Sequence, residues 1–229
     1  MSRISIRVTG PALALVALAF PAVSSAQPTR YCHGHRATIV GTSHADRIIG
    51  TDHRDVIVAG DGADRIDGRG GNDLICAGKG NDKVRGARGN DVIFGQEGND
   101  VENGNEGNDV LDGGEGNDVL DGDQGNDVEN GDQGNDIEQG DEGDDTLNGG
   151  EGRDHLNGGD GADVENGGPG DDVENGDDGD DRLSGGPGAD IENGGPGADT
   201  VETENDGDTN EADTDDQVEH SDSNSTQTD

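Results

Sequence analysis

The chain has 229 residues, of which 25% are hydrophobic and 1% aromatic, and its formal net charge at pH 7 is −40. So little apolar surface excludes an ordinary globular core, because burying it would not offset the conformational entropy lost on folding. The strong negative charge predicts that the protein binds neither nucleic acids nor anionic membranes and that it attracts cations.

Residues 1–26 have the pattern of a cleavable secretory leader. Arg3 and Arg7 precede the apolar run PALALVALAF, which is too short to span a bilayer, and Ser24 and Ala26 supply small residues before a cleavage point. A buried N-terminal helix is the alternative interpretation. The pattern predicts a signal peptide and therefore a secreted, extracellular protein that is not inserted in a membrane.

Residues 27–40 form the predicted N-terminal cap segment and hold one of the two cysteines. In the oxidising environment outside the cell, Cys32 and Cys76 are expected to form a disulfide. Two alternatives remain open at this point. Both cysteines could be buried thiols, or Cys32 could join His33 and His35 in a metal site, although no matching pair of ligands follows downstream.

Residues 41–202 repeat every nine residues without a slip. Over these eighteen repeats the sixth position is always Asp, the first and the fourth are each Gly in sixteen, and the eighth is aliphatic in twelve and Glu in six. Composition bias alone would not hold this phase, so low complexity explains the pattern poorly. The first two repeats have His44 and His53 instead of the fourth-position glycine, and we expect them to form an N-terminal cap.

Each position of the repeat has a physical reason. Glycine at the first and fourth positions is expected to adopt positive φ in a turn that is too tight for a Cβ. With backbone carbonyls crowding inward, the aspartate at the sixth position completes a cage of oxygen atoms. Calcium takes six to eight oxygen ligands and accepts irregular geometry more readily than magnesium. The seventh to ninth positions are long enough only for a short strand.

The segment GGEGNDVLD (113–121) resembles the GGxGxDxUx nonapeptide of the RTX, or haemolysin-type, calcium-binding family. The resemblance covers 41–202 and implies an all-β fold, a parallel β-roll of about nine 18-residue coils in which alternate repeats build two facing sheets. It also implies that multiple Ca²⁺ ions bind between neighbouring coils, each shared by the aspartates of two repeats one coil apart, as Asp100 with Asp118. The calcium ligands predicted in this way are Asp64, Asp73, Asp82, Asp91, Asp100, Asp109, Asp118, Asp127, Asp136, Asp145, Asp154, Asp163, Asp172, Asp181, Asp190 and Asp199.

Six repeats have glutamate at the eighth position, which should face the interior of the roll. One interpretation is duplication of a 36-residue unit in which Val or Ile at the seventh position turns inward through a local shift. The other is a weakened core that only bound calcium holds together. Residues 95–202 hold 35 acids against two arginines, whereas 27–94 are nearly neutral and should be more stable without metal. The six glutamates are Glu102, Glu129, Glu138, Glu165, Glu174 and Glu192.

The tail, residues 203–229, holds ten acids and no base and is expected to be disordered. The sequence predicts a monomeric, non-enzymatic calcium-binding module with a structural or interaction role, because it contains neither HExxH nor GxSxG and identifies no protein partner. Two alternatives stay open. The protein could be an acidic mineral- or surface-binding protein, or the non-catalytic remnant of a larger RTX-type enzyme or toxin.

Overall fold

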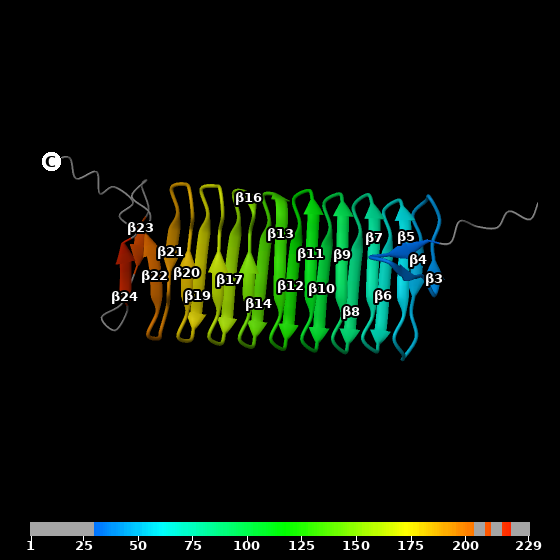
Figure 1. Cartoon of the computed structure of the whole chain (residues 1–229), viewed down its shortest axis with the longest axis horizontal. Helices are drawn as coiled ribbons and strands as arrows, with labels where there is room; N and C mark the ends of the chain where they lie inside the picture. The colour runs from blue at the N-terminus through cyan, green and yellow to red at the C-terminus, as the bar shows by residue number, and fades with distance from the viewer. Residues whose placement is uncertain (1–29, 204–208, 212–216, 221–229) are drawn as a thin grey trace, which may run out of the picture.

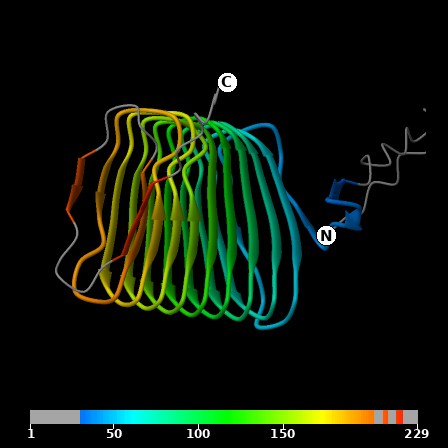
Figure 2. The same cartoon turned by 60° about the vertical axis from the view of Figure 1, so that its left-hand side comes forward.

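The computed structural model describes residues 30–203, 209–211 and 217–220, so the predicted signal peptide lies outside the described residues. Two parallel sheets face each other, and successive coils stack along one axis (Figure 1, Figure 2). Strand partners are 18 residues apart, so that Glu102, for example, pairs with Val84 on one side and Leu120 on the other. The predicted parallel β-roll of about nine coils is confirmed. The described part of the chain has no helix long and apolar enough to cross a membrane.

The strands alternate between the two sheets along the chain. A separate antiparallel pair, β1 (Tyr31–Cys32) and β2 (His35–Arg36), precedes them. One sheet has ten strands, β4 (Arg47–Ile49), β6 (Arg65–Gly70), β8 (Lys83–Arg88), β10 (Val101–Glu106), β12 (Val119–Gln124), β14 (Ile137–Glu142), β17 (His155–Asp160), β19 (Val173–Asp178), β21 (Ile191–Asn193) and β23 (Thr209–Glu211). The facing sheet has twelve strands, β3 (Ile39–Val40), β5 (Val56–Asp61), β7 (Leu74–Lys79), β9 (Val92–Glu97), β11 (Val110–Glu115), β13 (Val128–Gly134), β15 (Thr146–Asn148), β16 (Glu151–Gly152), β18 (Val164–Asn166), β20 (Arg182–Ser184), β22 (Thr200–Thr203) and β24 (Gln217–His220).

Most strands are longer than the three residues predicted. A strand such as β11 combines the last three positions of one repeat with the first three of the next. The first-position glycines do not have positive φ, so that part of the prediction was wrong, whereas it was correct at the fourth position for glycines such as Gly80 (φ 119°). From the third repeat onward the second position also has positive φ, and eight of these residues are not glycine, including Asn105 (φ 76°) and Asp123 (φ 69°).

Side chains at the eighth position fill the interior of the roll. Aliphatic residues at this position form a continuous cluster from Ile48 to Leu120. The six glutamates also point inward, and none is more than 1% exposed. The seventh-position residues Val101 and Ile137 are 38% and 48% exposed. The interpretation in which Val or Ile replaces glutamate inside the roll through a local shift was therefore wrong, because the pairing register is unbroken and the carboxylates are buried.

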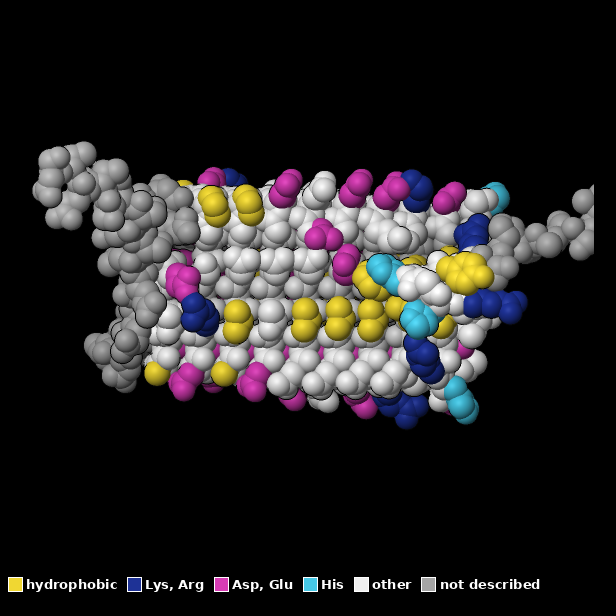
Figure 3. All heavy atoms as spheres, in the orientation of Figure 1, with side chains coloured by type: hydrophobic (Ala, Val, Ile, Leu, Met, Phe, Trp, Pro, Cys, Tyr) yellow, Lys and Arg dark blue, Asp and Glu magenta, His cyan; other side chains and the backbone are white. Residues whose placement is uncertain are grey.

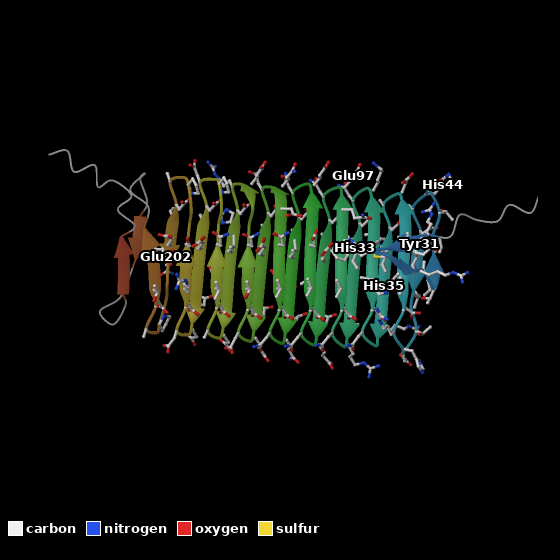
Figure 4. All side chains as sticks on the ribbon, in the orientation of Figure 1. Tyr31, His33, His35, His44, Glu97 and Glu202 are labelled. Carbon is white, nitrogen blue, oxygen red and sulfur yellow. A yellow bond between two sulfur atoms is a disulfide. The ribbon has the colours of Figure 1, made fainter. Side chains whose placement is uncertain are left out.

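The N-terminal hairpin is attached to the outer face of the twelve-stranded sheet by a disulfide between Cys32 and Cys76. The predicted disulfide is confirmed, and the alternatives of buried thiols and of a metal site that uses Cys32 are excluded. The ring of His33 stacks on that of Phe94, with 3.8 Å between the ring centroids, and Figure 4 shows the hairpin residues over this end of the sheet. The hairpin therefore covers the outside of the first coils.

Removing this disulfide should destabilise the N-terminal coils. The bond joins residues 44 positions apart. On the chain-entropy model, losing it should cost about 4 kcal/mol, because the unfolded chain gains freedom. We expect the double variant C32A/C76A to unfold at a clearly lower denaturant concentration than the wild type in saturating calcium. Equal unfolding midpoints would contradict this expectation.

The sheets extend beyond the predicted repeat region at both ends. β3 pairs with β5 and lies within the predicted cap segment. β23 pairs with β21 and β24 with β22, and both lie within the segment that the sequence predicts to be a disordered tail. The other tail residues after 203 lie outside the described residues.

Candidate metal centre

The sixteen predicted calcium ligands form two ladders, one along each edge of the roll. Each aspartate accepts, at Oδ1, a hydrogen bond from the backbone N–H of the sixth-position aspartate one coil earlier, at 2.6–2.9 Å. The pairs expected to share an ion are thus adjacent. The Asp100 N–H donates to Asp118 Oδ1 at 2.7 Å, and the Asp109 N–H donates to Asp127 Oδ1 at 2.6 Å. We call these residues the ladder aspartates.

In most of the ladder aspartates the second carboxylate oxygen, Oδ2, is buried away from every hydrogen-bond donor that the structure describes. All sixteen residues are at most 2% exposed. From Asp64 to Asp181, every Oδ2 atom is buried and has no hydrogen-bond partner among the described residues. A buried carboxylate oxygen without a donor is costly, since it has lost water and gained no replacement. Among the described residues, no side chain supplies the cation or proton that such a row of atoms needs.

The first-position glycines leave space beside these oxygens. A Cβ on Gly113 would lie 2.6 Å from Asp118 Oδ2. A Cβ on Gly95 would lie 2.5 Å from Asp100 Oδ2 and 2.7 Å from the carbonyl oxygen of Gly113. Glycine is therefore required here for space rather than for positive φ. The space is bordered by oxygen atoms from two coils, which is the donor set that calcium prefers, so the residues fit the ion that the sequence predicts.

The first two repeats satisfy the same oxygen differently. Thr51 donates to Asp55 Oδ2 from its backbone N–H at 2.7 Å and from its hydroxyl at 2.9 Å. Thr42 does the same to Asp46 Oδ2, at 2.6 Å and 2.9 Å. The carboxylates of these two repeats therefore need no cation, which agrees with their expected role as a cap. Sequence reasoning recognised the cap from its histidines but missed the threonines, although threonine stands at the second position only in these two repeats.

Filling the space beside one ladder aspartate should weaken one cation site. We expect G113A to fold, because Ala59 and Ala77 occupy the equivalent position in two N-terminal repeats. Its methyl group should displace Asp118 Oδ2, so that the variant binds one ion fewer than the wild type or binds it at least about tenfold more weakly. The control is E115Q, since Glu115 is exposed in the same repeat and Gln124 and Gln133 occupy the equivalent position in the next two repeats. Equal ion counts and affinities for G113A and wild type, by equilibrium dialysis, would refute this prediction.

The buried carboxylates have strongly altered proton affinity. Burial raises the pKa of ladder aspartates such as Asp100 and Asp136 to about 7. Burial also raises the pKa of Glu138 to about 8 and that of Glu174 to about 9. The pKa of Glu102 is raised well above its usual value, first by burial and then by the charges of Asp100 and Asp118. A cation or protons must therefore compensate this interior.

A second acidic group lies on the outer face of the ten-stranded sheet. Within the described residues, Asp121, Asp123 and Asp141 have ligand atoms within 4.8 Å of one another. The side-chain amide of Asn103 donates to Asp121 and Asp123, at 2.8 Å and 3.1 Å. Sequence reasoning did not single out these residues, because the ninth and second positions vary between repeats. Figure 3 shows further acids along both edges of the roll and most Lys and Arg side chains at its N-terminal end.

A comparison with known protein families matches the same repeats that carry the ladder aspartates. The RTX calcium-binding nonapeptide repeat family matches residues 40–75, 75–102, 103–138, 139–174, 166–201 and 175–209. A search of curated proteins gave no match. The family matches together span 40–209, which is well over half of the chain and includes all the ladder aspartates. The chain therefore belongs to the family of RTX calcium-binding nonapeptide repeat proteins.

Proposed function

We propose that this chain is a secreted, extracellular calcium-binding protein, a non-catalytic structural or interaction module whose acidic repeats fold when calcium binds. The observation that carries the proposal is the row of buried Oδ2 atoms without donors in the ladders. The sixteen ladder aspartates are the proposed ligands, together with backbone carbonyls of the turns. Ala59 and Ala77 replace the first-position glycine in the repeats of Asp64 and Asp82, so we expect the sites there to be the weakest.

Calcium would supply the positive charge that the interior lacks. Residues 95–202 have two arginines to compensate 35 acids, so their coils repel one another at neutral pH. A ligand that binds the folded state and not the unfolded chain stabilises the fold by its binding free energy. Because ladder neighbours come from successive coils, binding and folding of this part should be one event.

Secretion is supported by two features. The first is the sequence pattern of residues 1–26, a segment outside the described residues, which is that of a cleavable leader. The second is the Cys32–Cys76 disulfide, since disulfides persist in oxidising compartments. Calcium sites of extracellular modules commonly work at about 10⁻⁴–10⁻³ M. Residues 95–202 would thus remain unfolded until the protein meets calcium outside the cell.

Calorimetric titration of the secreted protein with Ca²⁺, and in parallel with Mg²⁺, tests the proposal. We expect several calcium ions per chain and much weaker magnesium binding, because magnesium demands regular octahedral geometry. No binding of calcium at millimolar concentration would refute the proposed function.

A further inference from the structure

We propose that the six buried glutamates are calcium ligands, each adding a second carboxylate to the site of the ladder aspartate in its own repeat. This inference rests on the proposed function. It concerns these six repeats and not the repeat as such, because the other twelve have an aliphatic residue at the eighth position. The six residues are Glu102, Glu129, Glu138, Glu165, Glu174 and Glu192, and we call them the interior glutamates.

Glu102 shows the geometry most directly. Its side chain crosses from β10 to the facing sheet and ends beside Gly95, the first residue of its own repeat. The point where a Cβ of Gly95 would lie is 2.5 Å from Asp100 Oδ2, 2.7 Å from Glu102 Oε1 and 2.7 Å from the Gly113 carbonyl oxygen. The two carboxylate oxygens are thus no more than about 5 Å apart, which one ion with Ca–O distances of about 2.3–2.6 Å can bridge.

Other interior glutamates end at the equivalent place in their coils. Glu174 Oε1 accepts a hydrogen bond from the Gly167 N–H at 2.5 Å, and Glu192 Oε1 accepts one from the Gly185 N–H at 2.8 Å. Both glycines hold the first position of the glutamate's own repeat. A Cβ on Gly167 would lie 2.9 Å from Glu174 Oε1 and 2.7 Å from Asp172 Oδ2, so this glutamate also adjoins its ladder aspartate.

The charges around the interior glutamates identify the same pairs of ladder aspartates. The acids that act on Glu138 are Asp136 of its own repeat and Asp154 one coil later. For Glu102 they include Asp100 and Asp118, which have the same two spacings. These are the pairs predicted from the repeat to share an ion. Glu102 and Glu138 therefore lie where a shared cation would also lie.

Backbone N–H groups donate to three of the interior glutamates, those of Gln139 to Glu129, of Gly167 to Glu174 and of Gly185 to Glu192. Both carboxylate oxygens of Glu102, Glu138 and Glu165 are buried and make no hydrogen bond of normal geometry within the described residues, although the nearby backbone N–H groups of Gly131 and Gly158 partly offset the effect of burial on the pKa of Glu138 and Glu165. The ion pairs among the described residues join exposed or half-exposed side chains, and none of them includes Glu102, Glu138 or Glu165. A buried carboxylate without a partner needs either a cation or a proton.

These two possibilities predict opposite results for glutamine substitution. If the interior glutamates bind calcium, glutamine removes charge from the folded, calcium-bound state and leaves the unfolded chain unaffected, so more calcium is needed for folding. If they are neutral and merely buried, glutamine removes the cost of burying an ionisable group, so the same amount of calcium or less is needed.

The test is a calcium titration of the sixfold variant E102Q/E129Q/E138Q/E165Q/E174Q/E192Q, followed by circular dichroism and by counting bound ions in equilibrium dialysis. The matched control removes six exposed acids, as E97Q/E106Q/E115Q/E142Q/E151Q/D160N. We expect the midpoint calcium concentration to rise at least about tenfold in the interior variant and to stay within about twofold of wild type in the control. A midpoint equal to or below that of wild type would overturn the inference.

Two further results keep the outcome unambiguous. If the sixfold variant does not fold at any calcium concentration, E102Q is compared with E106Q by amide hydrogen exchange. Protection of residues 95–120 should then need more calcium in E102Q, and equal requirements would overturn the inference. If wild type itself binds no calcium, the proposed function has failed, which differs from wild-type binding that the glutamine substitutions leave unchanged.

Discussion

Lowering the pH from about 8 to about 5 in the absence of calcium is expected to fold the acidic coils. Burial raises the pKa of Glu138 and Glu165 to about 8, that of Glu174 to about 9, and that of ladder aspartates such as Asp100 to about 7. A carboxyl group whose pKa is higher in the folded state than in the unfolded state binds its proton more tightly when folded. Its contribution to stability is complete below the unfolded pKa, which is 4.5 for Glu and 3.8 for Asp, and is lost as the pH rises through the folded value. The calcium-free protein should therefore unfold as the pH rises from about 5 to about 9.

Calcium affinity should have the opposite pH dependence and rise as the pH rises, since carboxylates must lose their protons to bind the ion. Circular dichroism of dilute protein with a chelator, followed from pH 5 to 9, measures the first effect, and calcium affinity at the same pH values measures the second. Greater stability of the calcium-free protein at pH 8 than at pH 5 would contradict the account. The experiment should stay above the isoelectric point, near 4.1.

Replacing all six interior glutamates by leucine is expected to make calcium dispensable for folding. Each substitution removes a buried carboxylate and adds an apolar side chain, whose burial contributes about 1.5–3 kcal/mol. Six such changes sum to on the order of 10 kcal/mol, which is comparable to the whole stability of a domain. The apolar cluster that now ends at Leu120 would then continue along the roll.

Thermal unfolding in the presence of a chelator measures this effect. The matched control places leucine at the exposed positions Glu97, Glu106, Glu115, Glu142, Glu151 and Asp160, where little apolar surface would be buried. The leucine variant should give a cooperative transition without calcium, and the control should not. If the two variants behaved alike, the interior glutamates would not be what makes the fold depend on calcium.

The repeat made the fold and the ladder aspartates predictable from sequence. Asp118 and its counterparts keep a strict nine-residue phase, and a phase of this kind specifies which residues face each other one coil apart. The pattern did not specify backbone angles. Gly113 was expected to need positive φ, but its role is to leave space for Asp118 Oδ2, which depends on the neighbouring side chain.

Other features depend on packing that the pattern leaves open. Glu102 could have faced either side of its strand on sequence grounds, because a valine precedes it, and the unbroken register decided the question. The role of Thr51, which donates two hydrogen bonds to Asp55 Oδ2, depends on the local turn geometry and not on the repeat pattern. β23 and β24 have no nonapeptide pattern, and they pair because β21 and β22 offer them free edges.

We propose above all that, near neutral pH, the acidic repeats fold only when calcium is bound. Circular dichroism of the secreted protein at about pH 7.5, first with a chelator and then with millimolar Ca²⁺, tests it most directly. The account predicts a spectrum with little β-structure in the chelator, limited to the disulfide-linked N-terminal coils, and a strong β-sheet spectrum after calcium is added. A full β-sheet spectrum in the chelator, unchanged by calcium, would contradict it.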